Sequence, residues 1–189
     1  MHPAQHRGLR ELYAMTRQLR NHWRTLAARL DPSAADQAQL LRDGSDQART
    51  LLAELEDVTT ARGVYGRPLA QGLGAQLATM HGALLDTALE VNQALRIAVL
   101  DVVHVVTLLD FLAGVSAKDA DAELQAFLER WSAQIRVQED AIRVAVIALA
   151  DDPDLSVRPS TPGCAGRIGH GAANALGTLG EWVDRRAGR

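Results

Sequence analysis

Two ionisable side chains stand three residues apart in an apolar stretch, residues 97–112, with the sequence IAVLDVVHVVTLLDFL. In a helix this spacing puts Asp101 and His104 on the same side. A carboxylate and an imidazole are common metal ligands, and helix pairing predicts a second carboxylate, Glu129, opposite them. Asp101, His104 and Glu129 are therefore the candidate metal site. In the alternative interpretation these residues are structural, with Asp101 paired to Arg136 and His104 paired to Glu129, because buried polar groups can set the register of packed helices.

The proposed ligand set resembles, in outline, that of the ferritin-like carboxylate proteins, which use two Glu-x-x-His elements and further Glu ligands. This chain has no Glu-x-x-His, and Asp101-x-x-His104 is a single variant of it. The chain also contains no GxxxxGK[ST], GxSxG or HExxH motif. Its one cysteine, Cys164, excludes an internal disulfide. The sequence favours a protein without catalytic activity and without a cofactor, apart from a metal ion at the candidate site.

The elements that would position these residues are four long helices. Apolar spacing predicts them over about 4–30, 32–62, 68–113 and 119–150, with Gly114 ending the third. The first carries an unbroken seam typical of near-antiparallel helix packing. Its members are Leu9, Leu12, Thr16, Leu19, Trp23, Leu26 and Leu30.

We therefore predict an all-α fold, an antiparallel up-down four-helix bundle over residues 1–151. A Pro/Gly/Ser-rich linker without regular structure follows over 152–166, and a tail helix over 167–189. If the helices pair about their loops, the hairpin of the third and fourth helices extends about 20 Å beyond the turn at Asp31.

The extended hairpin exposes apolar side chains that point away from the predicted helix seam. Because leaving several such side chains in water is unfavourable, we expect a homo-oligomer, most simply a dimer. The predicted interface consists of Leu100, Val103, Thr107, Phe111 and Trp131.

The tail carries Ile168, Leu179 and Trp182 on one side of a helix. We expect the tail to pack on the first three helices. The competing prediction is a docking peptide for a protein partner, similar in layout only to the cargo-loading tails of encapsulin cargo proteins.

Charge argues against a nucleic-acid partner, because the chain has a formal net charge of −3. The first helix has six arginines, with Glu11 as its only acid, and could bind nucleic acid or an acidic partner. No base-stacking aromatic residues accompany the arginines. We expect a solvated face paired with the acidic second helix, and no binding of nucleic acid.

The N-terminal residues lack the apolar core of a secretory signal, and two aspartates and a histidine make the 97–112 stretch costly in lipid. Of 20 basic side chains only Lys118 is a lysine, which is typical of GC-rich bacterial genomes. We expect a cytoplasmic bacterial protein that acts through protein–protein association. The alternatives are a ferritin-like metal-binding bundle and a membrane-active helical protein.

Overall fold

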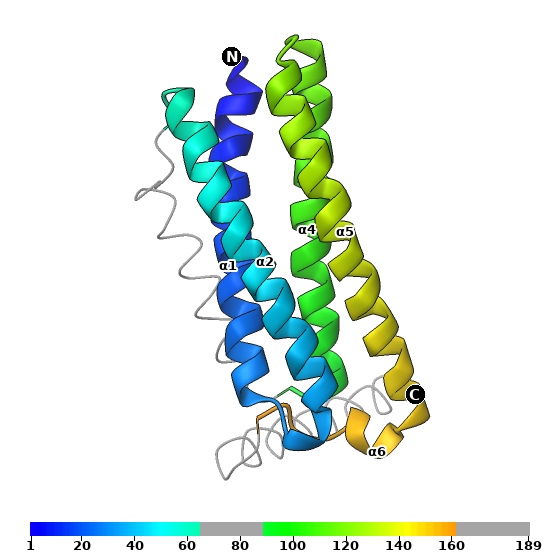
Figure 1. The fold of residues 1–189 in the computed structure, drawn as a ribbon. Helices are drawn as coiled ribbons and strands as arrows, with labels where there is room; N and C mark the ends of the chain where they lie inside the picture. Colours follow the sequence, from blue (N-terminus) through cyan, green and yellow to red (C-terminus); the bar gives the residue numbers. More distant parts are fainter. Residues whose placement is uncertain (65–88, 162–189) are drawn as a thin grey trace, which may run out of the picture.

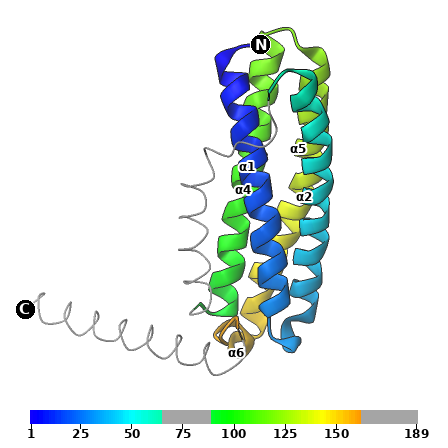
Figure 2. The same ribbon diagram turned by 90° about the vertical axis from the view of Figure 1, so that its left-hand side faces the viewer.

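Four long helices lie side by side and make up most of the described chain (Figures 1 and 2). The computed structural model describes residues 1–64 and 89–161. The long helices are α1 (Pro3–Arg29), α2 (Ala35–Ala61), α4 (Val91–Lys118) and α5 (Ala122–Ala148). Shorter helices are α6 (Pro153–Ser156) and two 3₁₀ turns, Pro32–Ala34 and Leu149–Asp151. These two described segments contain no strand, which confirms the all-α class.

Helix α1 begins and ends at local signals in the sequence. The His2 side chain accepts a hydrogen bond from the Ala4 N–H at 3.1 Å, and the Gln5 side chain accepts one from the His2 N–H at 2.8 Å. This reciprocal pair is a capping box. After α1, the Asp31 carboxylate accepts the Ser33 N–H at 2.8 Å and starts the next turn. All seven seam positions predicted for α1 are buried.

The packing of α1 on α2 centres on a tryptophan and a glycine. Trp23 is fully buried, and its indole N–H donates to the Ala98 carbonyl of α4 at 3.3 Å. A Cβ added at Gly44 of α2 would overlap the Trp23 ring, so only glycine fits beneath it. One residue further along, the Ser45 hydroxyl donates to the Arg20 carbonyl at 3.0 Å. These contacts set the register between α1 and α2.

Helix α4 begins later than the predicted third helix. Glu90 has an extended backbone (φ −72°, ψ 158°) and forms a capping box with Gln93. The prediction of one continuous helix over 68–113 is therefore wrong at Glu90, because the backbone there leaves the helical region. Residues 65–88 lie outside the described residues.

Helix α4 also ends later than predicted, because it passes through Gly114 and stops at Lys118. The turn to α5 uses Ala120 with a left-handed backbone (φ 55°). Figure 1 shows this turn at the same end of the molecule as the N-terminus, and the His2 N–H donates to Asp119 at 3.1 Å. The hairpin therefore does not extend beyond the turn at Asp31, which lies at the opposite end, and that prediction is wrong.

The direction of α4 also departs from the predicted up-down order. Arg62, just after α2, bonds Asp121, just after α4. Helices α2 and α4 thus end at the same end of the molecule and run in the same direction. Each of them is antiparallel to α1 and to α5.

The first part of the predicted linker is ordered. Asp152 caps α6, and the chain then forms an isolated antiparallel bridge between Pro159 and Glu90. The Val91 N–H donates to the Arg158 carbonyl at 2.9 Å, and the Ser160 N–H donates to the Leu89 carbonyl at 2.8 Å. The prediction of an irregular linker is wrong for these residues, because their backbone groups pair with the start of α4. The tail, with Ile168, Leu179 and Trp182, lies outside the described residues.

Candidate functional site

The three predicted metal ligands do not form one cluster, and each lies beside a different partner. Asp101 shares a hydrogen bond with His22 of α1, and both side chains are mostly buried. His104 lies 3.6 Å from the Glu11 carboxylate on α1. Glu129 accepts a hydrogen bond from Gln125 on its own helix at 2.7 Å. Among residues 1–64 and 89–161, no three His, Cys, Asp or Glu residues cluster as a metal site would require.

The structural pairs expected for these residues are also not the observed ones. Arg136 bonds Asp110 instead of Asp101, and the Ser132 hydroxyl donates to the same carboxylate. Because α4 continues to Lys118, its residues face α5 in a shifted register. Asp110 therefore occupies the position opposite Ser132 that Asp101 was expected to hold.

The predicted interface residues divide into an exposed row and a core residue. Leu100 and Phe111 are 66% and 54% exposed, Thr107 is exposed and Val103 is half-buried. Trp131 is only 2% exposed, and its indole N–H donates to Glu54 of α2 at 2.9 Å. Trp131 therefore belongs to the core. We call the remaining set the α4 row: Leu100, Val103, Thr107 and Phe111.

The α4 row lines a shallow groove of about 600 Å³ together with His104 and Leu108. The Thr107 hydroxyl donates to the Val103 carbonyl at 2.8 Å, so that its methyl group remains for contact. A second hollow of about 480 Å³ includes Phe111 and continues toward Lys118 and Asp119. The outer face of α4 is thus a mostly apolar surface that ends in charged residues.

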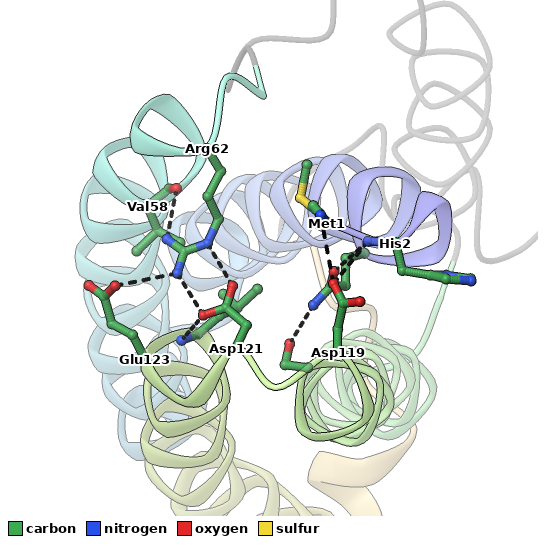
Figure 3. A network of polar contacts seen from close by, with 10 residues as sticks. Met1, His2, Val58, Arg62, Asp119, Asp121 and Glu123 are labelled. Carbon is green, nitrogen blue, oxygen red and sulfur yellow. Dashed lines mark hydrogen bonds and ion pairs between the residues drawn. The ribbon is translucent and has the colours of Figure 1, made fainter.

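Charged residues join the helix ends beyond this surface (Figure 3). Arg62 donates from Nε and Nη2 to the two carboxylate oxygens of Asp121, at 3.2 and 3.1 Å. Asp121 also accepts the Leu124 N–H at 3.0 Å and thereby caps α5. The hydrogen bond from Arg62 is the main reason that the pKa of Asp121 lies below its usual value.

We expect Asp121→Asn to lower the free energy of unfolding by about 1 kcal/mol at neutral pH, since it keeps the cap acceptor but loses the ion pair. The folded pKa is depressed, so this contribution is complete above the unfolded pKa of about 3.9 and is lost as pH falls through the folded value. Urea unfolding at about pH 7, 5 and 3 should show the two proteins converging at the lowest pH. Glu123→Gln is the control, because Glu123 is 91% exposed and should change stability little.

The arginines of α1 are not paired with α2, contrary to the expectation from the sequence. Within the described residues, Arg17, Arg20 and Arg24 form no ion pair with an acid. The acids of α2 have other partners, for example Glu54 with Arg130 and Asp46 with Arg49. The sequence analysis considered the arginines of α1 alone. It did not identify the surface that they form together with Arg42 and Arg49 of α2, although the spacing of seven residues indicates that these two share one side of their helix.

Comparison of the chain with known protein families, curated proteins and solved structures found no match. Among the described helices, α4 is long and apolar enough to cross a membrane, and half of its most apolar window is buried inside the protein. Core helices of water-soluble proteins also have this property, so length and composition alone do not assign α4 to a membrane.

Proposed function

We propose that this chain is a non-catalytic helical-bundle protein that acts through association, and that the α4 row contacts a second copy of the chain. The observation that carries the proposal is the exposure of Leu100 and Phe111 along one groove of α4. Burying such side chains contributes roughly 1.5–3 kcal/mol each. A twofold arrangement of two copies counts each contribution twice.

The surroundings of the α4 row support this choice. On one side His104 lies beside Glu11, and on the other Asp110 is bonded to Arg136. Asp110 is hydrogen-bonded within the chain, and His104 and Glu11 lie 3.6 Å apart, so polar residues flank the α4 row on both sides and form its rim. An apolar centre with a polar rim is the usual anatomy of a protein interface. A lipid-facing surface would favour apolar residues at these rim positions.

The test is the mass in solution of the wild type and of the double variant Leu100→Asp/Phe111→Asp, by light scattering. We expect the wild type to have the mass of two chains and the variant that of one, with association weakened more than about 100-fold and helicity kept. Val137→Asp/Val144→Asp is the matched control, since these valines are 63% and 66% exposed on α5.

The control should keep the mass of the wild type. A monomeric wild type with a helical circular-dichroism spectrum would refute self-association. If the wild type is monomeric but pelleted with neutral phosphatidylcholine vesicles, and the Leu100→Asp/Phe111→Asp variant is not, the α4 row is instead a membrane surface.

A further inference from the structure

Five arginines surround the contact between α1 and α2, which lie side by side in Figure 2. On α1, three arginines follow i, i+3, i+7 spacing, and the middle one is Arg20. On α2, Ser45 has arginines three residues before it and four after it, so they share its side of the helix. Because Ser45 bonds the Arg20 carbonyl at 3.0 Å, both sets flank one seam. This arginine face consists of Arg17, Arg20, Arg24, Arg42 and Arg49.

Little within the described chain neutralises the arginine face. Arg42 donates to the neutral Gln39 at 3.0 Å. Arg49 lies 3.2 Å from Asp46, but these side chains are 65% and 70% exposed, and such pairs contribute little. Among residues 1–64 and 89–161, no acidic side chain pairs with the three arginines of α1. Five guanidinium groups around one seam therefore produce a positive surface potential, which attracts an anionic partner.

The residues around the arginine face indicate which class of anionic partner it fits: a membrane, a protein or a nucleic acid. The large apolar side chains that are exposed within α1, α2, α4 and α5 all belong to α4 and α5. Surfaces that lie on membranes usually combine basic and apolar side chains, and protein interfaces usually combine arginine with buried tryptophan or tyrosine anchors. Single-stranded nucleic acid needs stacking aromatics, but Trp23 is buried and Tyr13 is packed against the core. A duplex backbone needs only positive charge and hydrogen-bond donors.

We propose that the arginine face binds the phosphate backbone of duplex nucleic acid without reading its sequence. Arg17 and Arg24 are seven residues apart, which corresponds to about 10.5 Å along α1. A duplex carries one charge per about 1.7 Å of its axis, so this length holds about six phosphates, roughly half of them facing the protein. Planar guanidinium groups match phosphate geometry. This proposal departs from the expectation of no nucleic-acid partner, which was based on the net charge of −3 and on the absence of base-stacking aromatics, because contact with a duplex backbone depends on local charge and needs no stacking.

The experiment is a fluorescence-anisotropy titration of the full chain with a random-sequence DNA duplex of about 25 base pairs, at salt concentrations from about 50 to 200 mM. We expect the logarithm of the binding constant to fall with the logarithm of salt concentration with a slope of about −3, since about three phosphates are neutralised. Arg17→Gln/Arg24→Gln should weaken binding and reduce the steepness of that slope by about 2. Changing the duplex sequence should leave the affinity unchanged.

The matched control is Arg96→Gln/Arg143→Gln, which removes the same charge from exposed positions on α4 and α5. It should keep the slope of the wild type. No duplex binding at the lowest salt, or an equal loss in the control, would overturn the proposal. Binding only to phosphatidylserine vesicles would overturn it in favour of a membrane. Leu100→Asp/Phe111→Asp should still bind the duplex with the slope of the wild type. This variant therefore tests nucleic-acid binding independently of self-association through the α4 row.

Discussion

Replacing Trp23 by alanine is expected to lower the free energy of unfolding by about 3–5 kcal/mol. The indole is fully buried between α1, α2 and α4, and it lies over Gly44, where a Cβ would overlap it. Removing the ring leaves a cavity beside a residue that has no side chain to fill it. The variant also loses the hydrogen bond from the indole to the Ala98 carbonyl. Because a domain of this size is stable by only about 5–15 kcal/mol, the loss is a large fraction of the total.

Urea unfolding followed by circular dichroism measures this effect, and a double-mutant cycle with Gly44→Ala tests its cause. In the wild type, Gly44→Ala should destabilise by about 1–3 kcal/mol, since the added methyl group displaces the indole. In the Trp23→Ala background the same methyl group has room and should cost less than about 0.5 kcal/mol. If Gly44→Ala costs the same in both backgrounds, the two residues do not pack as described.

The agreement between sequence and structure is closest where the decisive interactions are local. The α1 seam repeats every three or four residues, and every member is buried. The Asp31 carboxylate accepts the Ser33 N–H and starts the turn that follows the first helix, as Asp-Pro at a helix boundary indicates. Gly63, after α2, adopts the left-handed conformation (φ 68°) that commonly follows a helix. Short-range spacing is sufficient for these features.

The prediction of the metal site depended on the register between α4 and α5, and that register depends on whether α4 ends at Gly114. Gly114 was expected to end the helix, but glycine inside a helix costs only about 1 kcal/mol relative to alanine. The residues after Gly114 offset that cost, because Ser116 is buried and accepts a hydrogen bond from Gln5 of α1 at 3.3 Å. The helix therefore continues, and Asp110 instead of Asp101 faces α5. The partners of Asp101 and His104 then come from α1, which the hairpin argument had not considered.

The spacing of apolar residues also could not predict the direction in which α4 runs. The pattern of apolar residues continues through Glu90, but the capping box of Glu90 and Gln93 starts a new helix there. A capping box usually begins with Ser or Thr, so a Glu at this position gave a weak signal.

The arginine face was missed because it depends on the packing of two helices. Its five charges come from two helices whose net charges have opposite signs, and the packing of α1 on α2, which includes the contact between Ser45 and Arg20, brings them to one seam.

Trp131→Ala should act on folding and not on association, although the sequence placed this residue at an interface. The ring is 2% exposed, its N–H donates to Glu54 at 2.9 Å, and the Arg130 guanidinium lies 5.3 Å from the ring centre. We expect a loss of about 3–5 kcal/mol in the free energy of unfolding, from the cavity and from the lost hydrogen bond to Glu54, which keeps its ion pair with Arg130. Trp131→Phe keeps most of the ring volume and should cost about 1–2 kcal/mol.

Measuring both stability and mass distinguishes this core role from an interface role. Trp131→Ala should unfold at lower urea, yet keep the mass of the wild type when examined folded at low temperature. Phe111→Ala is the contrasting variant, because Phe111 is 54% exposed on the α4 row. It should weaken association and change monomer stability by less than about 0.5 kcal/mol, as surface substitutions usually do. If Trp131→Ala separated the copies without lowering the stability of each chain, Trp131 would belong to the interface, and its burial against α2 would not describe the protein in solution.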